Sequence, residues 1–155
     1  MMTIKTHSDY MEYCLVLAEK ALSNGNPPVG AILVYRNEVI GEGIESGKST
    51  SDITNHAEIN AIRNAIQKGK VDFLSDSIMY TTHEPCIMCS YVIRHHKISK
   101  IVFGTEVQFV GGCTSKLNVL TTDAVPKWGT GPEIIKGVLK DRCDILSKKF
   151  ENSLK

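Results

Sequence analysis

The stretch TNHAEINAI, residues 54–62, begins a predicted helix and carries an imidazole and a carboxylate two residues apart, on His56 and Glu58. Apolar side chains then recur at helical spacing, which predicts an amphipathic helix over 56–67 with one face in the core. Those side chains are Ile59, Ile62, Ala65 and Ile66. Thr54 or Asn55 is the expected N-cap. Two titratable groups at the head of a half-buried helix indicate a chemical role.

A second motif follows thirty residues later in TTHEPCIMC, residues 81–89, where Pro85 precedes Cys86 and Cys89 at helical spacing. Residues in the first turn of a helix can point past its end, so His56 from one helix and both cysteines from another can hold one metal ion. One nitrogen and two thiolates match zinc, which in catalytic sites takes three protein ligands and leaves the fourth position to water. Glu58 is then free to move a proton between water and substrate.

Simpler interpretations exist for each part. A lone C-x-x-C could be a redox pair, although the upstream H-x-E favours zinc. A structural zinc site would need a fourth ligand, for which Cys113 is the serious candidate. The remaining histidines are expected to be surface or helix-capping residues; these are His7, His83, His95 and His96.

Bulk composition narrows the function classes. The length of 155 residues suits a single domain over 1–155, and 18 basic against 17 acidic residues mark no obvious nucleic-acid or membrane-surface binder. No apolar run is long enough to span a bilayer and the first residues lack signal-peptide zones, so we expect no membrane partner. Five scattered cysteines predict reduced thiols and a cytoplasmic location.

Helices and strands alternate along the chain. Helices are expected over 8–22, capped by Ser8 or Asp9, then over 56–67, 86–96 and 139–150; strands are expected over 29–35, 39–45, 77–82, 100–105 and 133–139. Residues 106–131 lack clear periodicity, which is typical of a functional lid or of short unrecognised elements. The spacing indicates a mostly parallel central sheet with helices on its faces.

These motifs together resemble the zinc-dependent cytidine and nucleobase deaminase superfamily. The resemblance rests on PPVGAILV, VIGEGI, HAE, TTHEPCIMC and KIVFG in that order. It implies a three-layer α/β/α cytidine deaminase-like fold with a mixed five-stranded sheet. It also implies that His56, Cys86 and Cys89 bind one Zn²⁺ per subunit and that Glu58 shuttles protons while water replaces an amino group and ammonia leaves. A homodimer is implied as well.

The resemblance further implies substrate contacts by the Ala57 amide, the Glu84 carbonyl and Val29. Glu45 stands where relatives carry asparagine; a carboxylate there would only accept hydrogen bonds, so it favours a substrate with N–H donors, unless Glu45 points to solvent. Phe109 and Trp128 could stack on a planar base, although a core role is equally typical of them.

Three functions remain open. Near-neutral charge favours hydrolytic deamination of a free nucleobase, nucleoside or related amino-heterocycle. The alternative is a tRNA adenosine-to-inosine deaminase, which EPCIMC, GGCTSKLNV and GVLKDRC also resemble. A non-catalytic zinc-stabilised binding module is disfavoured by Glu58 and the open ligand position.

Overall fold

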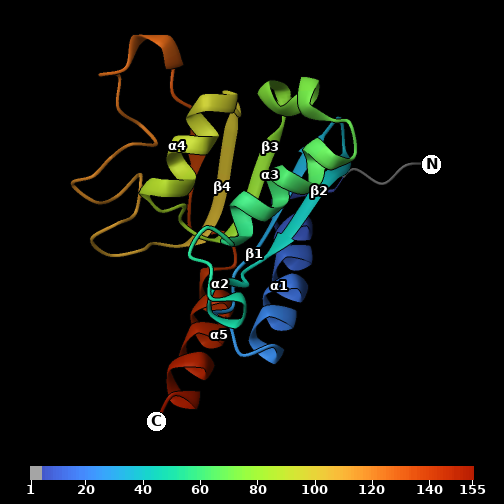
Figure 1. Ribbon diagram of the computed structural model, residues 1–155, viewed down its shortest axis with the longest axis vertical. Coiled ribbons are helices and arrows are strands. Elements are labelled where there is room, and N and C mark those ends of the chain that lie inside the picture. The colour runs from blue at the N-terminus through green and yellow to red at the C-terminus, as the bar shows by residue number, and fades with distance from the viewer. Residues whose placement is uncertain (1–4) are drawn as a thin grey trace.

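The structure is a computed structural model and describes residues 5–155. Helices and strands alternate as Figure 1 shows. In chain order the elements are α1 (His7–Ser23), β1 (Gly30–Tyr35), β2 (Glu38–Ile44), α2 (Gly47–Thr50), α3 (Ala57–Gln67), the 3-10 helix η1 (Val71–Asp76), β3 (Ile78–His83), α4 (Ile87–His96), β4 (Lys100–Thr105), the 3-10 helix η2 (Pro126–Trp128), β5 (Glu133–Ile135) and α5 (Lys140–Ser153).

The strands form one mixed five-stranded sheet in the order β2-β1-β3-β4-β5. A mixed sheet is confirmed, but the expectation that it is mostly parallel is wrong: of its four strand pairs within residues 5–155, two are antiparallel. The tight turn at Arg36 and Asn37, both with positive φ, folds β2 back on β1. β1 then pairs antiparallel with β3, so only the β3-β4-β5 half follows the parallel pattern.

Helices cover both faces of the sheet, which confirms the three-layer architecture (Figure 1). Alternate residues of a strand point to opposite faces. In β1, Ala31 and Leu33 pack with α3, whereas Ile32 and Val34 pack with α1. α5 adds a smaller cluster against α1 through Cys143 and Leu146, and it extends to the C-terminus at the bottom of Figure 1.

Glycines in β2 bring α3 directly onto the sheet. A Cβ at Gly43 would collide with backbone atoms of Ala57 and Ala61, and one at Gly41 would lie 2.5 Å from the Ala61 carbonyl oxygen. Without side chains at these points the helix backbone lies against the strand. This close approach fixes where the first turn of α3 lies, and with it the position of His56, which directly precedes that turn.

Several predicted boundaries shift. α1 is capped by Thr6, which shares a capping box with Asp9, so the prediction of Ser8 or Asp9 as the cap is wrong. α3 is capped by His56, not by Thr54 or Asn55, and α4 by Cys86. In both helices the residue before the first helical one therefore belongs to the metal motif and is not a typical polar N-cap. α2 and η1 were not predicted.

The segment 106–131 loops out beside α4 in Figure 1 and contains only η2 and an isolated bridge between Cys86 and Gly111. Its second half is tied to α4 by the buried Arg94, whose guanidinium donates to four carbonyl oxygens at 2.8–3.3 Å. The acceptors belong to Val119, Leu120, Thr122 and Gly129. The segment is thus irregular but anchored.

Candidate metal centre and base cavity

His56, Cys86 and Cys89 come together where α3 and α4 begin, with one possible ligand atom from each within 4.8 Å of the others. The His56 Nδ1 atom lies 3.5 Å from both sulfur atoms. A tetrahedral zinc ion with Zn–S of about 2.3 Å and Zn–N of about 2.0–2.1 Å separates nitrogen from sulfur by roughly 3.5 Å. The donor set and its spacing therefore fit zinc.

The local electrostatics favour a thiolate at Cys86. Hydrogen bonding with Cys89 and with His56 lowers the pKa of the Cys86 thiol to about 4. Cys86 also caps α4, and the positive end of a helix dipole stabilises negative charge there. A thiolate is the form that binds zinc.

Glu58 lies beside the three ligands in the first turn of α3. It is 3% exposed, its Oε1 atom accepts a 2.8 Å hydrogen bond from Thr81 Oγ1, and its Oε2 atom is 3.5 Å from Cys89 Sγ. The Thr81 hydroxyl also lies 3.0 Å from the His83 carbonyl oxygen, so β3 holds this carboxyl group in one orientation. Burial raises the pKa of Glu58 above its usual value, which suits a group that both takes and returns a proton near neutral pH.

A cavity of about 190 Å³ opens in front of His56, Glu58 and Cys86. Three of the residues predicted to contact substrate line it, namely Val29, Glu45 and Glu84, together with His83, Val107 and Val110. Ala57 is fully buried between the two motif residues of α3 and is not part of the lining.

Glu45 faces this cavity instead of solvent. It is 9% exposed, and among residues 5–155 its Oε2 atom has no hydrogen-bond partner. Burial raises the pKa of this carboxyl group to about 7, while the nearby His56 opposes the shift. A buried oxygen without a partner is suited to a donor from a bound molecule.

The two aromatic candidates lie away from the cavity lining. Phe109 is 84% exposed, with positive φ. Trp128 is buried beneath Tyr91, whose ring it meets edge-on, and beside the Arg94 guanidinium. Within this chain Trp128 packs between Tyr91 and Arg94, and a contact with substrate stays a prediction for both aromatic residues.

His83 was expected at the surface, and the structure corrects this. It lines the cavity, its Nε2 atom lies 2.8 Å from Ser147 Oγ of α5, and its Nδ1 atom lies 3.1 Å from Thr82 Oγ1. Burial lowers the pKa of its imidazole to about 4, so the ring is neutral at physiological pH. The only sequence signal was its place between a buried strand and the cysteine motif.

Cys113 does not belong to the metal group found among residues 5–155. Its backbone amide instead donates to the Glu84 carboxylate at 2.8 Å. The group therefore has three ligands and one side that faces the cavity. This is typical of a catalytic zinc site, whereas a structural site is closed by a fourth ligand.

Comparisons with known proteins agree with this geometry. The model of the cytidine and deoxycytidylate deaminase zinc-binding region matches residues 4–105. The tRNA-specific adenosine deaminase 2 of Xenopus laevis is 36% identical over 148 residues, covering 92% of this chain and 84% of that protein. The tRNA-specific adenosine deaminase of Aquifex aeolicus is 33% identical over 145 residues and covers 92% of both chains.

Solved structures show the same fold. A structure from a study of A-to-I editing by tRNA:A34 deaminases at the wobble position superposes with a TM-score of 0.80 at 28% identity, covering 88% of this chain and 97% of that one. A guanine deaminase from Nitrosomonas europaea has a TM-score of 0.78 at 19% identity, covering 97% and 87%, which shows the fold alone.

The relatives overturn the expected deamination of a free nucleobase or nucleoside, because tRNA-specific adenosine deaminases match most of the chain at 33–36% identity. That expectation rested on the net charge of +1, and a net charge says little about the field near one cleft. The zinc motif, the cavity and the matched region lead to one assignment: the chain belongs to the cytidine and deoxycytidylate deaminase family and is a zinc-dependent hydrolytic deaminase.

Proposed function

We propose that this protein deaminates adenosine to inosine in tRNA, with water as the second reactant and ammonia as the second product. The observation that carries the proposal is a cavity of about 190 Å³ at the zinc motif in a chain that aligns with tRNA-specific adenosine deaminases over 92% of its length. The wobble position of the anticodon, the target of the deaminases in a similar solved structure, is the position we expect.

His56, Cys86 and Cys89 would hold the zinc ion. When bound, zinc supplies a Lewis acid that brings the pKa of a bound water towards about 7. Glu58 takes a proton from water and delivers it to the base, and finally to the departing amine, while Thr81 keeps its carboxyl group aimed at the cavity. Carbon 6 of adenine loses nitrogen and gains oxygen, so the atoms balance.

Cavity walls orient the base. Val29, Val107 and Val110 supply apolar contact, and Glu45 supplies an acceptor for a hydroxyl or N–H donor of the target nucleotide. The Ala57 amide and the Glu84 carbonyl are proposed contacts to the ring and the leaving amine. Replacing Glu45 by Ala should raise KM by up to about tenfold, which corresponds to about 1.4 kcal/mol for one lost hydrogen bond, without loss of zinc. An unchanged KM would exclude this contact.

The decisive experiment uses purified zinc-loaded protein and an anticodon stem–loop with adenosine at the wobble position. We expect inosine by mass spectrometry of the digested RNA, and little ammonia from free adenosine, guanine or cytosine. A chelator should abolish the reaction and added zinc should restore it. Ammonia release from a free base without inosine in the RNA would refute the proposal.

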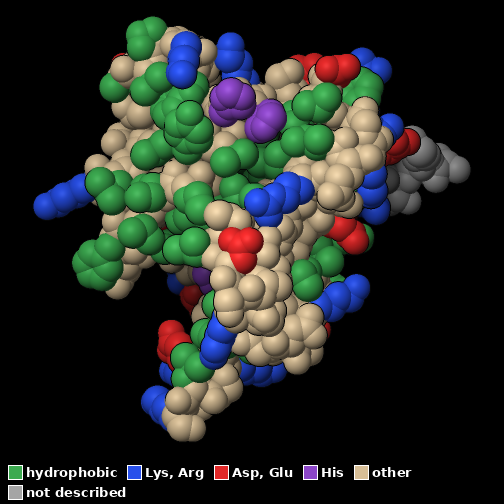
Figure 2. Space-filling model, viewed as in Figure 1, with side chains coloured by type: hydrophobic (Ala, Val, Ile, Leu, Met, Phe, Trp, Pro, Cys, Tyr) green, Lys and Arg blue, Asp and Glu red, His purple; other side chains and the backbone are tan. Residues whose placement is uncertain are grey.

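We also propose that two copies associate. Hydrophobic side chains gather over α4 and the segment after β4 on the face shown in Figure 2. Of the side chains of these two segments, Tyr91 and Leu117 are about half exposed, and Phe109 is 84% exposed. Covering such a patch is a common reason for self-association. Light scattering should give twice the chain mass, and a Tyr91→Asp, Leu117→Asp double variant should give the monomer mass.

A cytoplasmic location is proposed as well, since all five cysteines are free thiols and Cys86 and Cys89 must stay reduced to bind metal. Among residues 5–155, no helix is both long and apolar enough to cross a bilayer. Fractionation of cells that express a tagged chain would test the location.

A further inference from the structure

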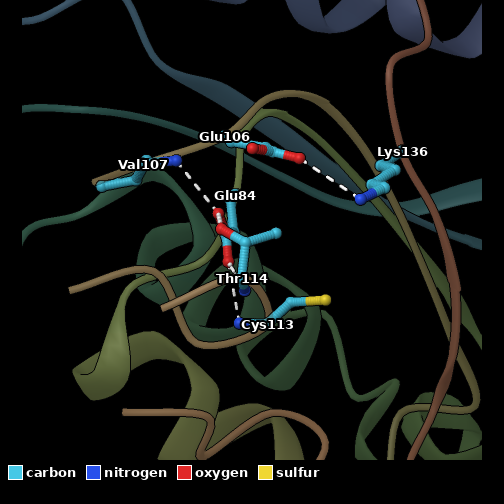
Figure 3. A network of polar contacts seen from close by, with 6 residues as sticks. All are labelled: Glu84, Glu106, Val107, Cys113, Thr114 and Lys136. Atoms are coloured by element: carbon cyan, nitrogen blue, oxygen red, sulfur yellow. Dashed lines mark hydrogen bonds and ion pairs between the residues drawn. The ribbon is translucent and has the colours of Figure 1, made fainter. Parts of the chain in front are cut away.

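The side chain of Glu84 lies at the centre of a polar network between the zinc motif and the segment after β4 (Figure 3). This residue is 2% exposed. Its Oε1 atom accepts from Val107 N at 3.0 Å and from Thr114 Oγ1 at 2.6 Å; its Oε2 atom accepts from Cys113 N at 2.8 Å and from Thr114 N at 2.6 Å. One carboxylate thus joins both ends of the loop formed by residues 107–114.

Backbone contacts complete the attachment. Ile87 N donates to the Val110 carbonyl at 3.0 Å, and Gly112 N donates to the Pro85 carbonyl at 2.8 Å. The approach is so close that a Cβ at Gly111 would lie 2.5 Å from the Glu84 carboxyl group. The loop 107–114 is therefore held against the residues that flank Cys86.

Two residues of this loop, Val107 and Val110, line the cavity next to Glu84 itself. The tip of the loop has little packing of its own, since Phe109 is 84% exposed. Another side-chain link nearby is the ion pair between Glu106 and Lys136, and both partners are more than half exposed. Exposed ion pairs contribute little to stability. Glu84 therefore supplies the side-chain contacts that join both ends of this cavity wall, in addition to the backbone hydrogen bonds at Val110 and Gly112.

We propose that the Glu84 side chain is a positioning residue: it fixes loop 107–114 as one wall of the cavity and so determines which base is accepted. This inference rests on the proposed deamination of adenosine for its substrate. It assigns to the Glu84 carboxylate a role separate from that of its backbone carbonyl.

The chemistry of the network requires a carboxylate. All four partners donate, and an ionised carboxylate only accepts. Glutamine has the same shape, but its NH₂ group would face donors. The Thr114 hydroxyl can turn to accept, whereas the backbone N–H groups cannot, so at least one N–H group loses its acceptor. Glu84→Gln therefore conserves volume but removes at least one of the four hydrogen bonds. Glu106→Gln makes the same chemical change in the exposed ion pair and is the matched control.

Loop order is measured first, because it needs no substrate. In Glu84→Gln, we expect amide hydrogen exchange of peptides spanning 107–114 to be at least about tenfold faster, the factor that corresponds to one lost hydrogen bond to a charged group. Alkylation of Cys113 should accelerate in parallel, with zinc content unchanged. Glu106→Gln should stay within twofold of the unmodified chain. Should Glu84→Gln not fold, Thr114→Val, which removes one donor, is expected to give a smaller acceleration of the same peptides.

Base selection is measured second, with two stem–loops that differ only in adenosine or the bulkier 2-aminoadenosine at the target position. We expect Glu84→Gln to raise KM for the adenosine stem–loop more than it lowers kcat. The ratio of kcat/KM for adenosine to kcat/KM for 2-aminoadenosine should fall at least about threefold relative to the unmodified chain. Unchanged loop exchange, or faster exchange with an unchanged preference, would overturn the inference. If the unmodified chain deaminates neither RNA, the proposed function fails, whereas the exchange and alkylation data still decide whether Glu84 holds the loop.

Discussion

Replacing Glu58 by glutamine separates catalysis from folding in this protein. The amide has the volume of the carboxyl group, and its carbonyl oxygen can still accept from Thr81 Oγ1, now 2.8 Å away. Cys89 Sγ lies 3.5 Å from the Oε2 atom that the NH₂ group would replace. Because a zinc-bound Cys89 is a thiolate, it can accept a hydrogen bond from that NH₂ group. Because no buried group loses its partner, we expect the free energy of unfolding to change by less than about 1 kcal/mol.

The reaction, however, loses its proton carrier. General acid–base catalysis by one positioned side chain contributes roughly 10²–10⁴-fold, or about 3–5.5 kcal/mol of activation free energy. We expect single-turnover inosine formation in Glu58→Gln to fall by that factor, with one zinc ion per chain and an unchanged urea midpoint. A variant that keeps its zinc and reacts within tenfold of the unmodified rate would refute the role of Glu58. Loss of zinc would show that the carboxylate serves the metal instead.

Three further perturbations test other parts of the structure. Arg94→Met removes the donor of four carbonyl oxygens, and each buried acceptor left without a partner costs about 1–3 kcal/mol. We therefore expect urea unfolding to show a loss of at least about 3 kcal/mol. A loss below about 1 kcal/mol would contradict the anchoring of 106–131. Burial lowers the pKa of His83 from 6.5 to about 4, so the unfolded chain binds a proton that the folded chain does not in this range. The stability that His83 contributes is therefore complete above pH 6.5 and falls by roughly 2–3 kcal/mol towards pH 4. In urea titrations at pH 5 and pH 7, the free energy of unfolding of His83→Gln should change less with pH than that of the unmodified chain. An equal change in both chains would count against a neutral His83 ring in the folded protein. Gly43→Ala forces α3 away from β2. We expect calorimetry to show a loss of about 1–3 kcal/mol in the free energy of unfolding, together with weaker zinc binding. An unaltered melting temperature would mean that the helix can shift freely.

The sequence by itself determined the chemistry and much of the architecture. One imidazole and two thiols at this spacing favour zinc, because ligand type and count match a catalytic zinc site. The hydrolytic deamination was implied by the resemblance of these motifs to the deaminase superfamily. Likewise, apolar periodicity located most helices and strands, since burial of one face repeats along each element. The cap of α3 was misassigned because the position that usually carries a polar cap carries the metal ligand His56 here. The cap of α1 was misplaced by two or three residues, since Thr6 and not Ser8 or Asp9 precedes the first turn.

The tertiary structure decided what depends on contacts between distant residues. No local pattern shows that Glu84 binds the amides of 107–114, that His83 turns into the cavity, or that Arg94 anchors an irregular segment. Likewise, the direction of β1 against β3 follows from where the chain re-enters the sheet, not from the residues of either strand. The choice between a free base and a tRNA was beyond composition, because net charge sums over the whole surface, whereas recognition depends on the few groups around one cleft.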